Sequence, residues 1–144
     1  MRIFIDTNIL LDVFLERKDF YDDSAFIWKL AENRIEEVCI SAISFNNIHY
    51  IMRKNQGQEC AQRAMEILNT NFTTAPLTHD IISKAIALRL PDFEDALHFF
   101  SAISVDANHL VTRNAKDFPQ GILSVLSPQV FLTQYTDNNQ HPSE

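Results

Sequence analysis

Acidic residues in three separate segments of the chain have the chemistry of a metal-dependent hydrolase. Asp6 follows a predicted strand at residues 2–5, Asp95 lies early in a predicted helix, and Asp117 comes shortly after a predicted strand at residues 109–112. Carboxylates that converge without a balancing Lys or Arg repel one another, and a hard divalent cation between them removes the repulsion. Mg²⁺ or Mn²⁺ held by such oxygen ligands can polarise a phosphate and activate a water molecule. If the three segments meet in the fold, we expect phosphodiester hydrolysis.

The pattern of apolar and polar residues predicts that these segments do meet. Short apolar runs predict strands at residues 2–5, 37–40, 72–75, 109–112 and 124–126. Helical spacing lies between them, at residues 7–16, 22–33, 41–53, 58–68, 78–90, 92–105 and from 128 onwards. This alternation predicts an α/β fold with three layers, α/β/α, around a mostly parallel sheet of about five strands. The carboxyl ends of the first and fourth strands then share one edge of the sheet, where such folds bind ligands.

Length and composition limit the classes of protein to which the chain can belong. The 144 residues, 46% of them hydrophobic, fit one domain over residues 1–136, and the polar residues 137–144 are expected to form a disordered tail. The sequence has neither an apolar stretch long enough to cross a bilayer nor a signal-peptide pattern, so we expect a cytoplasmic protein without a membrane partner. The net charge of -7 argues against broad electrostatic capture of nucleic acid, but it allows an enzyme that meets phosphates through bound cations.

Four segments of the chain together resemble the PIN domain, the fold of many bacterial VapC-type toxin ribonucleases and of other single-strand nucleases. They are Ile3-Phe4-Ile5-Asp6-Thr7-Asn8-Ile9-Leu10, Ile40-Ser41-Ala42-Ile43-Ser44, Pro91-Asp92-Phe93-Glu94-Asp95-Ala96-Leu97 and Leu110-Val111-Thr112-Arg113-Asn114-Ala115-Lys116-Asp117-Phe118. Their order and separation span about residues 1–132, nearly the whole chain. An Asp-Thr-Asn triplet alone is a weak signal, whereas the four segments in this order form a specific one.

The resemblance implies a metal-dependent endoribonuclease and assigns roles to matching positions. Asp6 and Asp95 match metal ligands of the family, and Asp117 matches the acid of its terminal Asp-Phe pair. Asn8 and Thr112 match positions that support the site by hydrogen bonding. The family further implies Mg²⁺ or Mn²⁺ as the cofactor and RNA as the substrate. It also implies an antitoxin protein as a partner in a toxin–antitoxin pair, and a homodimer.

Two positions depart from the family pattern by carrying an amide where an acid is common. Asn47 stands where the third helix often has Glu, and Asn114 stands where an acid often follows the fourth strand. An amide oxygen can bind a cation but adds no negative charge, so Asn47 and Asn114 are expected to support the site. We therefore expect weak metal binding, or binding only together with a substrate phosphate. The same departures favour an alternative: a catalytically impaired PIN-like module that binds RNA or protein.

Each chemical interpretation also has a simpler structural alternative. Asp6 can act as nothing more than the N-cap of the helix that follows. Asp92 and Glu94 are expected only to favour a helix N-terminus through the macrodipole. Arg113 is a candidate for contacting a substrate phosphate, and the alternative is an ordinary surface charge. A phosphatase with Asp6 as a covalent nucleophile is a more distant alternative, because Asn8 replaces the second acid that such enzymes need.

Overall fold

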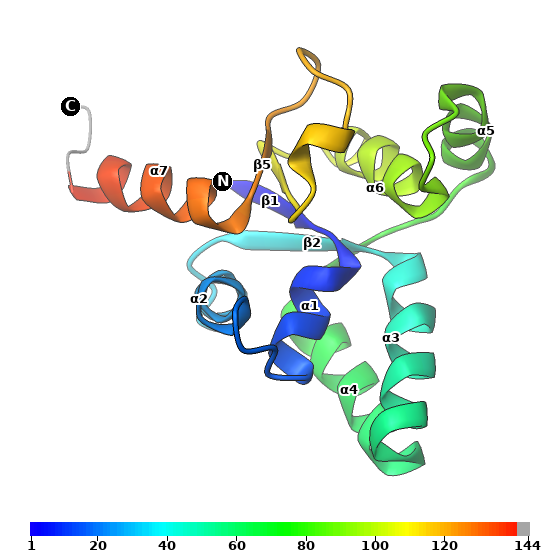
Figure 1. The fold of residues 1–144 in the computed structure, drawn as a ribbon, viewed down its shortest axis with the longest axis vertical. Coiled ribbons are helices and arrows are strands. Elements are labelled where there is room, and N and C mark those ends of the chain that lie inside the picture. Colours follow the sequence, from blue (N-terminus) through cyan, green and yellow to red (C-terminus); the bar gives the residue numbers. More distant parts are fainter. Residues whose placement is uncertain (141–144) are drawn as a thin grey trace.

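A parallel sheet organises the protein, whose computed structural model describes residues 1–140. Five strands lie in the order β3-β2-β1-β4-β5, and every neighbouring pair is parallel. They are β1 (Arg2–Ile5), β2 (Glu37–Ser41), β3 (Thr73–Ala75), β4 (His109–Val111) and β5 (Val125–Leu126). Helices cover both faces of this sheet (Figure 1), which confirms the predicted three-layer α/β/α fold.

The helices match the predicted segments closely, and the largest difference lies at the C-terminus. They are α1 (Thr7–Phe14), α2 (Tyr21–Glu32), α3 (Ala42–Gln56), α4 (Gln58–Asn71), α5 (His79–Leu88), α6 (Phe93–Ser104) and α7 (Pro128–Gln140), with a 3₁₀ turn η1 (Ala115–Asp117). Because α7 continues to Gln140, residues 137–140 are helical where a disordered tail was expected. The rest of that expected tail, residues 141–144, lies outside the described residues. Within residues 1–140, no helix combines the length and the hydropathy that crossing a bilayer requires.

The alternation of side chains along β1 divides the core between the two faces of the sheet. Ile3 and Ile5 point to one face, where they pack with residues of α1, α2, α3, α4 and α7. Phe4 points to the opposite face and packs against Phe99 of α6. Helix α5 lies outside α6, and Ile81 belongs to the small cluster between them. Since successive side chains of a strand face opposite ways, the three consecutive apolar residues of β1 are enough to anchor both layers.

The sheet brings the ends of β1 and β4 together at its carboxyl edge. The Asp6 amide donates to the Val111 carbonyl at 3.2 Å, and the Thr112 amide donates to the Leu126 carbonyl at 2.9 Å. The residues that directly follow β1 and β4 are therefore held in the same hydrogen-bonded plane as the strands. These backbone hydrogen bonds hold Asp6 and Thr112 close together without any contribution from their side chains.

Helices α3 and α4 form a pair that extends away from the sheet (Figure 1). Ser41 begins α3 as its N-cap, with its hydroxyl accepting from the Ile43 amide at 3.2 Å. Gly57 separates the two helices and has a φ of 93°, a conformation that side chains with a Cβ rarely adopt. Helix α3 thus starts at the carboxyl edge of β2 and leads outward from it.

Candidate active site

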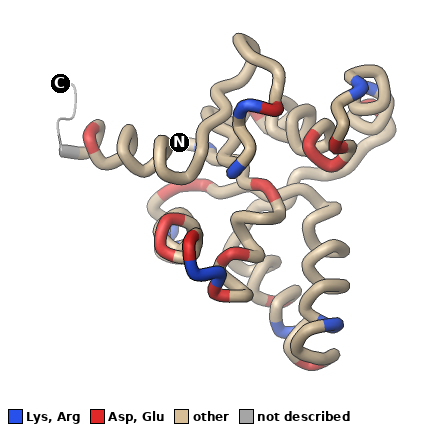
Figure 2. Tube along the Cα trace, in the orientation of Figure 1, with Lys and Arg blue, Asp and Glu red and all other residues tan. Residues whose placement is uncertain are grey.

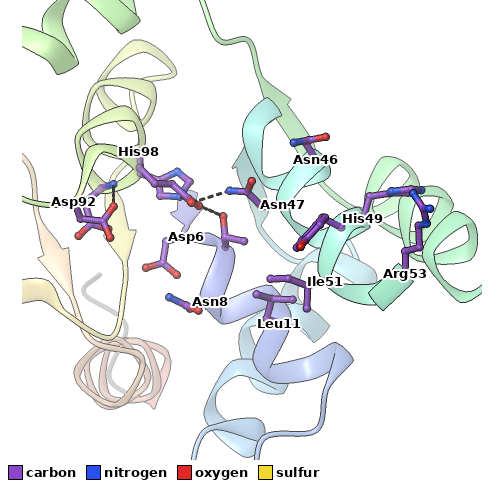
Figure 3. A pocket seen from close by; sticks show the side chains of 14 residues that line it. Asp6, Asn8, Leu11, Asn46, Asn47, His49, Ile51, Arg53, Asp92 and His98 are labelled. Atoms are coloured by element: carbon purple, nitrogen blue, oxygen red, sulfur yellow. Dashed lines mark hydrogen bonds and ion pairs between the residues drawn. The ribbon is translucent and has the colours of Figure 1, made fainter. Parts of the chain in front are cut away.

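A pocket of about 630 Å³ opens at the carboxyl edge of β1. Its walls come from the turn between β1 and α1, from the start of α6 and from one face of α3. The polar residues among them are Asp6, Thr7, Asn8, Asn46, Asn47, His49, Tyr50, Arg53, Asp92, Glu94, Asp95 and His98. Figure 3 shows Asp6 and Asn8 between the N-cap residue Asp92 and His98 of α6 on one side and Asn47 of α3 on the other. The pocket therefore lies at the edge where the sequence predicted a ligand site.

Asp6 is a buried acid held by two donors. Its side chain caps α1, with Oδ1 accepting from the Ile9 amide at 3.2 Å. Its other oxygen, Oδ2, accepts a short hydrogen bond from the Thr112 hydroxyl. Burial raises the pKa of Asp6 above its ordinary value, although the nearby His98 and the hydroxyl of Thr112 oppose that rise. Asp6 thus fulfils the simple capping role and also presents a carboxylate to the pocket.

Asp95 is joined to Asp6 by a chain of hydrogen-bonding groups. The Asn114 Nδ2 donates to Asp95 Oδ2 at 2.8 Å, and Asn114 Oδ1 lies 2.7 Å from the Thr112 hydroxyl oxygen. That hydroxyl has a single proton, so it donates either to Asp6 or to Asn114 at any one moment. Thr112 and Asn114, which were predicted to support the site, lie between the two acids.

The environment of Asp95 disfavours its charge. Burial, together with the charge of Asp92, raises the pKa of Asp95 to about 6, although the hydrogen bond from the Asn114 amide opposes the shift. The charge of Asp6 is a smaller cause in the same direction, so the two predicted metal ligands repel each other. A cation shared between them would relieve this repulsion.

A second set of hydrogen bonds centres on Glu94, for which the sequence predicted only a role at the helix N-terminus. The Thr7 hydroxyl donates to Glu94 Oε1, and the Asn47 Nδ2 donates to Oε2 at 2.7 Å. His98 Nε2 lies 3.1 Å from Oε1. Burial raises the pKa of Glu94, but the hydrogen bonds from His98, Thr7 and Asn47 outweigh it, and the net pKa is lowered. Glu94 therefore remains a carboxylate at neutral pH, beside Asn47.

The two amides that depart from the family pattern therefore act as donors. Asn47 donates to Glu94, and Asn114 donates to Asp95, so each amide orients one carboxylate at the pocket. The sequence interpretation missed Glu94 and His98. The available signal was their separation by four residues in a predicted helix, which places both on the same face.

The remaining predicted residues differ in whether they line the pocket. Asn8 is exposed at the pocket, and its Oδ1 accepts from Arg17 Nη1 at 3.3 Å. Asp117 is exposed on η1 and does not line the pocket, so its role as a third acid stays a prediction. Arg113 also lies outside the lining of the pocket, with its guanidinium carbon 4.0 Å from the centre of the Phe20 ring.

Arg113 belongs instead to a cluster around the buried carboxylate of Asp12. Asp12 is completely inaccessible to solvent, and its Oδ1 lies 3.4 Å from Arg113 Nη2 and 3.3 Å from Arg17 Nη1. Its other oxygen accepts from the Ser24 hydroxyl at 3.1 Å. The cluster joins α1, α2 and the segment after β4, and it ties Asn8 to them through Arg17. An acid within the apolar run of α1 was the sequence signal for this feature.

The donor set fits a divalent cation that keeps much of its water. Across residues 1–140, no three His, Cys, Asp or Glu side chains are placed to hold a metal ion between them. Asp6 and Asp95 offer carboxylate oxygens at the same pocket, and Mg²⁺ is commonly held by one or two carboxylates together with waters and substrate phosphates. The residues present therefore fit an ion held jointly with substrate better than one enclosed by protein alone.

The raised pKa of Asp95 predicts that the metal-free protein loses stability as pH rises. Its carboxyl binds a proton more tightly when folded, so the stability it contributes is present below pH 3.8 and lost as pH rises through about 6. We expect the free energy of unfolding in urea, measured without metal across that window, to fall more steeply for the wild type than for Asp95→Asn. Parallel pH profiles for the two proteins would contradict the assigned environment of Asp95.

The family model that matches the chain and the similar solved structures agree with each other. Residues 2–116 match the family model of the PIN domain. A toxin–antitoxin complex from Klebsiella pneumoniae is 26% identical, with a TM-score of 0.65 over 88% of this chain and 97% of that chain. VapBC2 from Rickettsia felis, bound to a fragment of promoter DNA, is 23% identical, with a TM-score of 0.65 over 88% of this chain and 98% of that one.

A further similar structure is a toxin that cleaves a defined loop. VapC20 of Mycobacterium tuberculosis, a toxin that cleaves the sarcin-ricin loop, is 18% identical, with a TM-score of 0.61 over 75% of this chain and 86% of that chain. At this identity the likeness shows a shared fold alone. No curated protein matches the chain.

Proposed function

Because this chain belongs to the PIN domain family, we propose that it is a divalent-metal-dependent endoribonuclease and the toxin of a toxin–antitoxin pair. The observation that carries the proposal is the arrangement of Asp6 and Asp95, two buried acids at one open pocket, linked through Thr112 and Asn114. Structural likeness to VapC toxins supports the same class of activity. No protein nucleophile is required for such a reaction, because water is the attacking group.

The chain's own residues would position the reacting groups. Asp6 and Asp95 would hold Mg²⁺ or Mn²⁺, which supplies a Lewis acid for the phosphate and a means of activating water. Thr112 fixes the orientation of Asp6, and Asn114 fixes that of Asp95. Because these acids are tied down before substrate arrives, little reorganisation remains when RNA binds.

The other predicted residues enter the proposal with less direct support. Asn8 and Asn47 line the pocket and would support it from α1 and α3. For Asp117 to act as a third acid and Arg113 as a phosphate contact, RNA must extend beyond the pocket toward the segment after β4. Arg113 is 26% exposed in its side chain, so part of the side chain stays accessible while it pairs with Asp12.

An antitoxin partner is part of the same proposal. Similar structures include toxin–antitoxin complexes, which supports a neutralising protein encoded beside this one. We also propose that the protein forms a homodimer, as the family implies. Because the proposed substrate is RNA, we propose that the protein acts in the cytoplasm. Co-purification of this chain with the product of the neighbouring reading frame would test the partnership directly.

Removal of the metal and replacement of Asp95 test the enzymatic proposal. Purified protein with labelled single-stranded and stem–loop RNA should cleave with Mg²⁺ or Mn²⁺ and should stop when EDTA is added. Asp95→Asn should lower the cleavage rate by about 100-fold or more, because a charge at the reacting centre is lost. Gel analysis of the end-labelled products measures both effects.

The outcome separates the proposal from the alternative of a binding module. If the Asp95→Asn protein cleaves as fast as the wild type, the activity comes from a contaminant and the proposal is wrong. Metal-independent RNA binding without any cleavage would instead favour the catalytically impaired module suggested by Asn47 and Asn114.

A further inference from the structure

We propose that the pocket continues along α3 into a subsite, formed by Tyr50 and Arg53, that takes one unstacked base and a neighbouring phosphate of single-stranded RNA. This inference rests on the proposed function and names its substrate class more closely. It concerns a part of the pocket that none of the predicted site residues occupies. The two residues are called the Tyr50–Arg53 subsite below.

Helical spacing places the subsite in line with the candidate active site. Asn47, Tyr50 and Arg53 are three residues apart in α3, so each is a neighbour of the next on the helix surface, and all three line the same pocket. Figure 3 shows Asn47 close to the acids and Arg53 farther along α3, on the side away from Asp6. A chain of nucleotides with one phosphate at Asp6 and Asp95 would therefore pass along this face.

Tyr50 has the properties of a platform for a base. It is 65% exposed, while Ile48 and Met52 of the same helix are buried in the core. It lines the main pocket and also a smaller hollow of about 270 Å³, shared with Arg53 and Lys54. Proteins that bind single strands stack bases on such side chains with little preference for sequence.

The distribution of charge around the pocket favours the same assignment. Asp6, Asp92, Glu94 and Asp95 make one end acidic, and Arg53 is the only Lys or Arg in the lining. Arg53 and Lys54 occupy the last turn of α3, where Figure 2 shows basic residues far from the acids at the start of α6. Neither forms an ion pair within residues 1–140. Their charges are thus available to a phosphate in a protein that otherwise repels RNA.

RNA binding by the non-cleaving protein tests the subsite separately from catalysis. In an Asp6→Asn background, fluorescence anisotropy with a short labelled single-stranded RNA in Mg²⁺ gives the Kd without loss of the probe. We expect Tyr50→Ala to raise the Kd about tenfold and Tyr50→Phe to leave it unchanged, because the ring is what stacks. Tyr50→Leu, which keeps apolar bulk on the helix, should behave as Tyr50→Ala does.

A charge-matched control isolates the phosphate contact. Arg53→Ala should raise the Kd and reduce the salt dependence of binding by about one phosphate contact. Arg63→Ala removes the same charge from an exposed position on α4 and should do neither. Equal effects of Arg53→Ala and Arg63→Ala would show only a general electrostatic attraction and would overturn the phosphate contact.

The possible failures are distinguishable from one another. An unchanged Kd in both Tyr50→Ala and Tyr50→Leu overturns the subsite even if the wild type cleaves RNA. Ring-dependent binding by a wild type that never cleaves would support the subsite while refuting the nuclease. If the variants lose affinity for the co-expressed protein partner and keep full affinity for RNA, the face belongs to that partner and the proposal is wrong.

Discussion

Replacing Asp6 by Asn is expected to lower kcat/KM for RNA cleavage by about a thousandfold, which corresponds to several kcal/mol of lost transition-state stabilisation. Asn caps a helix about as well as Asp does, so the hydrogen bond to the Ile9 amide survives the change. Thr112 can still donate to the new side-chain oxygen. The variant therefore removes the negative charge and leaves the local structure intact.

Two measurements make this result specific. Thermal unfolding should show a metal-free Asp6→Asn protein at least as stable as the wild type, because burial of the Asp6 carboxyl already disfavours its charge. Asp80→Asn, the same change at an exposed acid on α5, should cleave at the wild-type rate. Undiminished cleavage by Asp6→Asn would refute the proposed metal site, whatever the stability of the variant.

Replacing Asp12 by Ala is expected to cause the largest loss of stability among changes to the residues around the site. The substitution leaves Arg17 and Arg113 without their buried partner and Ser24 without its acceptor. Removing one member of a buried charge pair is strongly destabilising, and the partial exposure of both arginines places the expected cost at about 2–4 kcal/mol. Thermal unfolding should show a Tm lower by roughly 6–12 °C.

A neighbouring acid provides the comparison for this change. Asp19→Ala removes an exposed carboxylate from the segment before α2 and should change the stability very little. Asp12→Asn should lie between the two, because it can keep a hydrogen bond to Ser24 while losing the charge that faces the arginines. A Tm for Asp12→Ala equal to that of Asp19→Ala would mean that the cluster does not stabilise the fold.

The amides at Asn47 and Asn114 have a structural explanation that differs from a simple loss of ligands. Each donates to a carboxylate of α6, so the site keeps Glu94 charged beside Asn47 and keeps Asp95 oriented beside Asn114. The expectation of weak metal binding still applies to Asp6 and Asp95, since neither amide adds charge. A carboxylate at the position of Asn47 would face Glu94 directly, and the repulsion would be costly without a cation.

Sequence alone predicted the fold and the position of Asp6 and Asp95 at one edge of the sheet, because the necessary information is local. Apolar runs and helical spacing depend on neighbouring residues, so the strands, their mostly parallel arrangement and the shared edge at the ends of β1 and β4 could be inferred from the sequence. Asp6 and Asp95 could be brought to one edge because each lies beside a predicted strand or helix end.

Tertiary structure alone decided which partners those residues meet. Glu94 looked like an ordinary acid at a helix start, and only the packing of α6 against α1 and α3 brings Thr7 and Asn47 to it. Arg113 was a candidate for phosphate, and only the fold shows it paired with the buried Asp12. Side-chain hydrogen bonds and ion pairs depend on positions fixed to within an ångström across segments far apart in the chain, and residue patterns carry no information at that precision. The sequence therefore determined the scaffold and its central acids, and the fold determined the contacts that orient them.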